Sequence, residues 1–245
     1  MIRLAYVQKK DGEFFSEATY SFWHGCQKLG IETVAFDQDA GIDGLDITKD
    51  TVVYGGIGIV RKAFDRLGVP QPTVGEMPPA EVLPFYKRRV WVTTMAEVRQ
   101  GYEDNRFFFI KPLREHKAFG GHVTSPSIAT LQLTARFPDD FPIFASEIMH
   151  FIAEYRMFIH EGKIRGSRLY RGDYRVMPDY TVADEFLKTI ELPPIAYSLD
   201  IGVSESGLTA VVEINDAFSL GHYGFPSVPY TNMVLDRWQQ IVGTL

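Results

Sequence analysis

Two acidic residues and an asparagine near the carboxyl-terminal end of the sequence have the spacing of a metal-binding hairpin. Glu213 and Asn215 lie two residues apart in an apolar segment, so on a strand both side chains project from the same face. A turn at 204–207 is expected to place Asp200 opposite Glu213 on the partner strand. Two such carboxylates repel each other unless a cation lies between them, and oxygen ligands favour Mg²⁺. The pattern therefore predicts a magnesium site, with an exposed polar sheet face as the alternative.

A lysine in the middle of the sequence has the surroundings of a phosphate ligand. Lys111 follows the hydrophobic run 107–110, so its strand is expected to be buried while its side chain emerges at the strand's end. The basic loop after it contains Lys117 and closes on Gly120 and Gly121. A lysine ammonium acts as a point charge toward a polyphosphate, and glycines let a loop close over phosphates. This segment alone is explained equally well by a solvated charged loop.

Arginines on a second predicted hairpin could bind negative charge in the same cleft. Glu154 and Arg156 share one face of a strand, and the return strand carries further arginines at positions 165, 168 and 171. Arginines beside a lysine and a metal suit a triphosphate or an acyl phosphate. The alternative is a surface pair formed by Glu154 and Arg156.

Alternating strands and helices are expected to position these residues. In the first part of the chain, the periodicity predicts strands at 2–7, 32–36 and 51–54 and helices at 16–29 and 59–67. This order indicates a small α/β lobe. Its Gly55-Gly56-Ile57-Gly58 segment lacks the spacing of a dinucleotide-binding loop, so a tight turn is favoured over a phosphate cradle.

A connection rich in proline is expected to lead to a second lobe. Five prolines lie between residues 70 and 84, and proline neither continues a helix nor fits a central strand. The elements predicted after it are strands at 106–110, 143–149, 154–159, 163–170, 196–201 and 209–214, and helices at 181–190 and 232–242.

Composition limits the classes of partner and the compartment. The formal net charge is −6, whereas proteins that grip a nucleic-acid backbone usually carry a basic surplus. Cys26 is the single cysteine, which excludes an intrachain disulfide and predicts a buried, inert thiol. The sequence shows no secretory signal and no apolar run of about 20 residues, so we expect a soluble, cytoplasmic protein without membrane association.

The order of these motifs resembles the ATP-grasp superfamily. The segments 154–159, 162–164 and 212–218 are similar to a divergent clade rich in functional arginines. That clade includes the eukaryotic chaperone that assembles translation initiation factor two, and bacterial and phage relatives. The resemblance implies an α/β (α+β) ATP-grasp fold at 81–245, whose two lobes clasp ATP, preceded by a small α/β lobe at 1–80.

The resemblance also implies a nucleotide site. The residues that match its ATP-binding positions are Arg88, Lys111, Lys117, Glu147 and Met149. Lys111 would contact the α- or β-phosphate and Lys117 the γ-phosphate, while the segment with Glu147 and Met149 would hold adenine and ribose. Arg88 stands where many relatives have their first lysine, and the sequence does not distinguish it from Arg89.

The implied catalytic groups complete the set. Asp200, Glu213 and Asn215 would hold Mg²⁺. Arg156 and either Arg168 or Arg171 would face the acceptor, and Lys111 would act with them.

Three functions are compatible with these residues. The first is an ATP-dependent ligase that activates a carboxylate, of a peptide or protein, for attack by an amine or similar nucleophile. The second is an ATP-loaded chaperone or adaptor with little turnover. The third is ATP-dependent joining or modification of nucleic-acid ends, against which the acidic composition weighs. The complete set of lysine, arginines and metal ligands favours the ligase.

Overall fold

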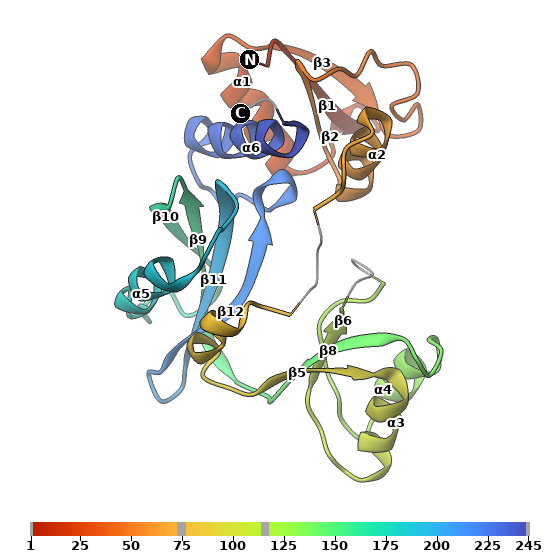
Figure 1. Ribbon diagram of the computed structural model, residues 1–245, viewed down its shortest axis with the longest axis vertical. Helices are drawn as coiled ribbons and strands as arrows, with labels where there is room; N and C mark the ends of the chain where they lie inside the picture. The colour runs from red at the N-terminus through yellow and green to blue at the C-terminus, as the bar shows by residue number, and fades with distance from the viewer. Residues whose placement is uncertain (1, 73–76, 114–117, 244–245) are drawn as a thin grey trace.

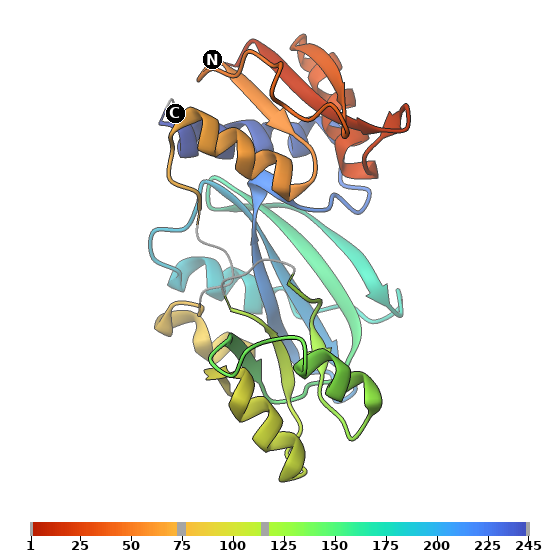
Figure 2. The same ribbon diagram turned by 90° about the vertical axis from the view of Figure 1, so that its right-hand side faces the viewer.

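Three four-stranded sheets form the framework of the protein. The computed structural model describes residues 2–72, 77–113 and 118–243 (Figure 1). The sheet of the first lobe lies at the top of Figure 1, the middle sheet below it, and the third sheet at the bottom right. The view turned by 90° shows the same succession of layers (Figure 2).

The first lobe is a small α/β unit, as the periodicity predicts. Its elements are β1 (Leu4–Lys10), β2 (Glu13–Phe14), α1 (Glu17–Leu29), β3 (Glu32–Asp37), β4 (Thr51–Tyr54) and α2 (Ile57–Leu67). Strand β1 lies between β3 and β4 and runs parallel to both. Ser16 caps α1 in a reciprocal capping box with Thr19, and Gly30 ends the helix in the left-handed conformation. The glycines after β4 allow a close approach, because a Cβ on Gly55 would lie 2.4 Å from Oε1 of Gln8.

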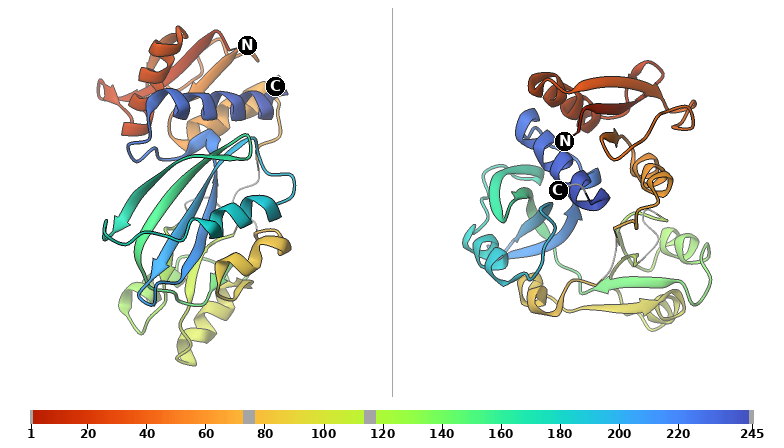
Figure 3. Two further views of the ribbon diagram at one scale, coloured as in Figure 1. Left: turned by 90° about the vertical axis from the view of Figure 1, so that its left-hand side faces the viewer. Right: turned by 45° about the horizontal axis from the view of Figure 1, so that its top comes forward.

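The last helix, α6 (Ser227–Val242), belongs to the core of this first lobe. It lies between the sheet of the first lobe and the middle sheet (Figure 3). Phe64 packs on Trp238 with ring centroids 4.8 Å apart. Gly25 brings α1 and α6 together, since a Cβ there would lie 2.0 Å from Oγ1 of Thr231. The division of the chain at residue 80 remains a prediction, but the hydrophobic core joins both ends of the sequence.

The middle sheet has one apolar and one polar face. Its order is β10-β9-β11-β12, with bounds β9 (Phe151–His160), β10 (Lys163–Gly172), β11 (Ala196–Ser204) and β12 (Thr209–Asp216). Tyr155, Met157 and Leu199 pack in one core with residues of α5 (Thr181–Thr189) and of the 3₁₀ helix η1 (Ala80–Tyr86). Alternation along the strands therefore turns their neighbours toward the opposite face.

The third sheet carries the lysine segment. Its order is β5-β8-β6-β7, with bounds β5 (Val90–Thr94), β6 (Phe109–Pro112), β7 (His122–Val123) and β8 (Pro142–Ser146). Helices α3 (Met95–Glu103) and α4 (Ile128–Thr134) accompany it, and Met95 and Ile143 lie in its core. Residues 147–150 connect β8 directly to β9, so they join the third sheet to the middle sheet.

Several predicted boundaries are wrong for local reasons. The strand predicted at 106–110 begins at Phe109, because the Arg106 N–H donates to Gly101 and so helps to close α3. The strand predicted at 143–149 ends at Ser146, and the final helix begins at Ser227. The proline-rich connection includes η1, which accommodates Pro84. Helices α3 and α4 are not predicted, because their short apolar stripes are weak.

The structure tests the prediction made for the single cysteine. Cys26 is fully buried, and burial raises the pKa of its thiol to about 12. None of the described helices combines the length and the hydropathy that a bilayer-spanning segment requires.

Candidate functional site

A row of charged side chains crosses the polar face of the middle sheet. The strand register pairs Arg168 with Arg156, Arg156 with Asp200, and Asp200 with Glu213. Residues directly opposite each other on antiparallel strands project from the same face. An irregularity after Asp200 lets Ile201 pair with Val211, which keeps the apolar side chains of β12 in the core. The prediction that Asp200 lies opposite Glu213 is confirmed.

Arg156 and Asp200 form a buried, two-pronged ion pair. Nε of Arg156 donates to Oδ1 of Asp200 at 2.8 Å, and Nη2 donates to Oδ2 at 2.6 Å. The side chains are 8% and 1% exposed. Burial raises the pKa of Asp200 to about 6, against the opposing effect of the Arg156 guanidinium. The protein itself therefore supplies a positive charge beside Asp200. The sequence pattern predicts only a metal ion in that role.

Glu213 has a looser set of partners. Nζ of Lys111 lies 3.4 Å from Oε2 of Glu213, and Nδ2 of Asn215 donates to Oε1 at 3.0 Å. Burial disfavours the charged carboxylate, but Lys111, Asn215 and Arg156 outweigh it and hold the pKa of Glu213 below its usual value. Asn215 also donates to Oδ2 of Asp200 at 3.4 Å, so one amide links both carboxylates.

These three residues fit a magnesium ion by the chemistry of their donor atoms. Mg²⁺ in nucleotide sites is held by one or two carboxylates together with phosphate oxygens. Asp200 and Glu213 supply the carboxylates. Oδ1 of Asp200 and both oxygens of Glu213 each accept one described hydrogen bond and keep a second lone pair, whereas Oδ2 of Asp200 accepts from both Arg156 and Asn215. Asn215 adds an amide oxygen. Within the described ranges, no group of three or more His, Cys, Asp or Glu side chains offers an alternative cluster.

A cavity of about 370 Å³ lies between the middle and third sheets. Residues from β6, β8, the 147–150 connection, β9, β10 and β12 line it. The predicted site residues among its walls are Arg88, Lys111, Glu147, Met149 and Glu213. Segments that are distant in sequence thus meet at one cavity. Glu213 lies in its wall, and the rest of the charged row extends from Glu213 across the middle sheet.

Arg88 and Arg89, which the sequence does not distinguish, have different contacts in the structure. Nη1 of Arg88 donates to the carbonyl oxygen of Val211 at 2.8 Å, and Nε donates to Oγ of Ser146 at 3.3 Å. Arg88 therefore ties the middle sheet to the third sheet while it lines the cavity. The Arg89 guanidinium instead lies over the Trp91 ring, 5.2 Å from its centroid.

The connection with Glu147 and Met149 is fixed to the neighbouring strand. The N–H of Glu147 donates to the Arg89 carbonyl at 3.0 Å, and its Oε2 accepts from the Arg89 N–H at 2.9 Å. The carboxylate of Glu147 thus holds the backbone in place. Ile148, Met149 and His150 of the same connection also line the cavity.

Arg168 and Arg171, which the sequence does not distinguish, differ in their position relative to the cavity. Arg168 donates to the Gly224 carbonyl at 3.2 Å, and its guanidinium lies 5.9 Å from the Phe225 ring centroid. It belongs to the charged row but does not line the cavity, whereas Arg171 does. Lys117 lies outside the described residues.

The comparison with protein families agrees with this geometry. A model of the ATP-grasp domain, family 2 of the R-two-K clade, matches residues 85–233, which is more than half of the chain. The chain belongs to this ATP-grasp family. The match covers the third and middle sheets and part of α6. The resemblance to the ATP-grasp superfamily is therefore confirmed, while the narrower likeness to the eukaryotic chaperone and to phage relatives remains a prediction.

Solved structures show that the whole chain has the ATP-grasp fold. D-cycloserine synthetase DcsG superposes with a TM-score of 0.57 at 11% identity, covering 96% of this chain and 99% of that one. The D-alanine–D-alanine ligase from Bacillus anthracis complexed with ATP gives 0.54 at 13% identity, covering 100% and 99%. The ATP-grasp ligase PsnB with a minimal precursor gives 0.53 at 12% identity, covering 100% of both chains. No curated protein matches the sequence.

Sequence reasoning missed part of this ATP-grasp site. Glu154 is 6% exposed and lines the cavity, where Oε2 accepts from the Tyr170 hydroxyl at 2.8 Å and Oε1 from Arg171 at 2.9 Å. The Tyr223 ring centroid lies 5.0 Å from the Arg156 guanidinium, and Tyr170 stacks on Tyr223 at 5.2 Å. Glu154 could have been predicted, because it lies two residues before Arg156 on the same strand and so projects from the same face. No spacing in the sequence indicates the two tyrosines.

Proposed function

We propose that this ATP-grasp protein is a Mg·ATP-dependent ligase that activates a carboxylate as an acyl phosphate for attack by an amine or another nucleophile. The observation that carries the proposal is the meeting of Lys111 with Glu213 in the cavity, where Glu213 continues the row of Asp200 and Arg156. From the cavity outward, the order in space is therefore Lys111 as a candidate phosphate ligand, then the candidate metal ligands, then Arg156.

The cavity would hold the nucleotide. Backbone groups of the 147–150 connection and the Met149 side chain would contact adenine and ribose, and Lys111 would contact the α- or β-phosphate. Arg88, which also lines the cavity, would add a second positive charge, and Lys117 would approach the γ-phosphate. When Lys111 turns to the phosphates, it leaves Oε2 of Glu213 free.

Asp200, Glu213 and Asn215 would hold the magnesium ion, which when bound neutralises charge on the phosphate oxygens. Asn215 contacts both carboxylates through Nδ2, so its amide would turn over to present Oδ1 to the same ion. Arg156 is held in one orientation by its paired hydrogen bonds to Asp200, and it would present its remaining donors to the transferring phosphoryl group.

The reaction would proceed in two displacements. A carboxylate oxygen of the acceptor attacks the γ-phosphorus, the bond to the bridging oxygen breaks, and ADP leaves. The amine nitrogen then attacks the acyl carbon, the bond to the phosphate oxygen breaks, and phosphate leaves while the amine proton passes to solvent. Arg156 and Arg168 would stabilise negative charge on the acceptor side, and exclusion of water would protect the acyl phosphate. The resemblance implies a peptide or protein carboxylate as the acceptor.

The experiment is a calorimetric titration of ATP with Mg²⁺ present, followed by an assay of ADP release with a panel of peptide and amino-acid acceptors. Binding that is lost in both Glu213→Gln and Lys111→Ala, with ADP release that depends on an acceptor, supports the ligase. Binding without ADP release for any acceptor and amine would instead support an ATP-loaded chaperone or adaptor. Absence of magnesium-dependent binding by the wild type would contradict the proposal.

A further inference from the structure

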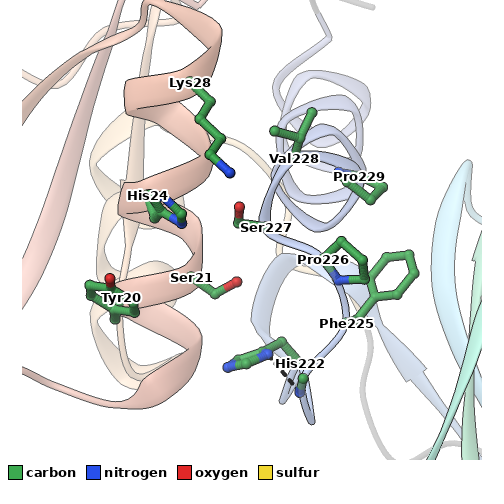
Figure 4. Close-up of a pocket in the computed structure, with 11 residues that line it drawn as sticks. Tyr20, Ser21, His24, Lys28, His222, Phe225, Pro226, Ser227, Val228 and Pro229 are labelled. Atoms are coloured by element: carbon green, nitrogen blue, oxygen red, sulfur yellow. Dashed lines mark hydrogen bonds between the residues drawn. The ribbon is translucent and has the colours of Figure 1, made fainter.

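A second hollow, of about 410 Å³, lies between α1 and the segment that leads into α6 (Figure 4). None of the residues that line it belongs to the walls of the nucleotide cavity. Ser21, His24 and Lys28 face it from α1, at the spacing of one helix face, and Ser227 and Val228 face it from α6. The hollow is therefore built by two helices of the first lobe's core.

The amino-terminal end of α6 leaves two backbone donors unused. The first four N–H groups of a helix have no partner within the helix. Pro226 and Pro229 occupy two of these positions and have no N–H, and the first helical bond runs from Tyr230 to the Pro226 carbonyl. The N–H groups of Ser227 and Val228 remain, and neither has a hydrogen-bond partner among the described residues. They stand at the positive end of the dipole of a 16-residue helix, which favours an anion.

The hydroxyl of a largely buried serine points to the same space. Ser21 is only 6% exposed, and no described residue forms a hydrogen bond with its side chain. Most of the residue is covered, but its hydroxyl reaches the hollow, where a ligand or water can form the hydrogen bond that the protein does not supply. Figure 4 shows the Ser21 hydroxyl directed from α1 into the space toward α6, with the Ser227 hydroxyl and the Lys28 ammonium above it. Neither Lys28 nor the Ser227 side chain has a described hydrogen-bond or ion-pair partner.

The rest of the hollow is apolar. Tyr20 stacks on His24, and Phe225 and Pro226 contribute to the walls. The Nδ1 atom of His222 is occupied, because it accepts from the Gly224 N–H at 2.9 Å. A group that uses the polar donors must therefore lie beside aromatic and proline surfaces. A carboxylate attached to an apolar body satisfies both parts of the hollow, whereas free phosphate would satisfy only the first.

We propose that this hollow binds the carboxylate of an apolar carboxylic acid, such as the end of a peptide, through the Ser227 and Val228 N–H groups, the Ser21 and Ser227 hydroxyls and the Lys28 ammonium. The site goes beyond the proposed ligase activity and requires neither ATP nor magnesium. Gly25 makes it possible, because the missing side chain lets α6 begin directly against the Ser21–Lys28 face of α1.

The test is a calorimetric titration of the full chain, without nucleotide, with three probes. These are N-acetylphenylalanine, N-acetylphenylalaninamide and inorganic phosphate. We expect N-acetylphenylalanine to bind, and the amide, which lacks the charge, to bind at least about tenfold more weakly. Binding of both organic probes with equal affinity, no binding of N-acetylphenylalanine, or binding of phosphate alone would each overturn the proposal.

Variants locate the binding. Ser21→Ala and Lys28→Met should each weaken N-acetylphenylalanine binding by roughly fivefold to tenfold, whereas Lys62→Met, an exposed lysine of α2, should leave it unchanged. Thermal unfolding checks that all three remain folded. The Lys111→Ala protein should retain N-acetylphenylalanine binding even though its ATP binding is weakened, which separates the two sites. Equal binding by the wild type, Ser21→Ala and Lys28→Met would place the probe elsewhere and overturn the assignment.

Discussion

Two ion pairs, one within the charged row and one between its last residue and Lys111, differ in how firmly they are made. Arg156 and Asp200 share two hydrogen bonds of 2.8 and 2.6 Å and are almost completely buried. Lys111 and Glu213 are joined by one contact of 3.4 Å, and their side chains are 27% and 34% exposed. The first pair has the features of a fixed part of the framework, and the second those of a contact that a ligand can replace. A firm pair within the middle sheet thus lies next to a looser pair that joins the middle sheet to the third sheet.

Breaking the fixed pair should have the largest effect on stability. Asp200→Ala leaves the Arg156 charge buried without a partner, and we expect a loss of about 3–5 kcal/mol in the free energy of unfolding. Urea-induced unfolding followed by circular dichroism measures this value. The matched variant is Glu213→Ala, for which the partly exposed pair predicts a loss below about 1 kcal/mol. Similar losses in both variants would show that the two pairs do not differ as described.

Removing the exchangeable cation should separate binding from stability. Lys111→Ala is expected to weaken ATP binding by about tenfold or more, because a hydrogen bond between charged groups is lost. Its free energy of unfolding should change by no more than about 1 kcal/mol. Calorimetry and urea unfolding of the same preparation provide both numbers. Lys163→Met, on an exposed position of β10, is the control; a large loss of stability in Lys111→Ala would contradict the comparison.

The arginine that joins the two sheets offers a conservative test. Arg88→Lys keeps the charge but cannot reach both the Val211 carbonyl and Ser146, so we expect a loss of about 1–2 kcal/mol in unfolding free energy. Arg89→Lys removes only a contact with Trp91 and should cost less than about 0.5 kcal/mol. Thermal or urea unfolding of the pair distinguishes these values. The reverse order would assign the connecting role to Arg89.

Cys26 extends the comparison to an ionisable group buried without a charged partner. Its raised pKa, about 12, means that the thiol keeps its proton well above the usual value of 9.0. The folded protein should therefore resist a thiol-specific disulfide reagent at pH 8, and the unfolded protein should react at once. The stability contribution of this proton is present below pH 9.0 and is lost as the pH rises toward 12. Rapid reaction of the native thiol would contradict the burial.

The sequence predicts those parts of the site that depend on local order along the chain. Side chains alternate along a strand, which places Glu213 and Asn215 on one face, and a short turn brings Asp200 opposite them. One hairpin therefore contains all three candidate metal ligands. The bond between Arg156 and Asp200 depends instead on β9 and β11 being neighbours, although β10 and α5 separate them along the chain. No periodicity encodes that adjacency. The choice between Arg88 and Arg89 likewise rests on Val211, a residue distant in sequence.

The same limit applies to the fold. The alternating strands and helices of the first lobe are predicted well because each apolar stripe is local and is bounded by caps such as Ser16 and Gly30. The position of α6 is not predicted. Its row of apolar residues shows that one face is buried, but it does not show which element that face packs against. The contact between Gly25 and Thr231 that fixes this position involves a glycine and a threonine, whose types carry little information by themselves.

The docking of α6 on the first lobe has a consequence for the modularity of the chain. The backbone crosses between the first lobe and the two other sheets twice, once through the segment after α2 and once through the residues before α6. Because both ends of the chain contribute to the first lobe, replacing one continuous segment cannot exchange the whole lobe. A chimera that takes residues 1–80 from a relative must also take its final helix, because the two segments share Phe64, Trp238 and the surrounding core.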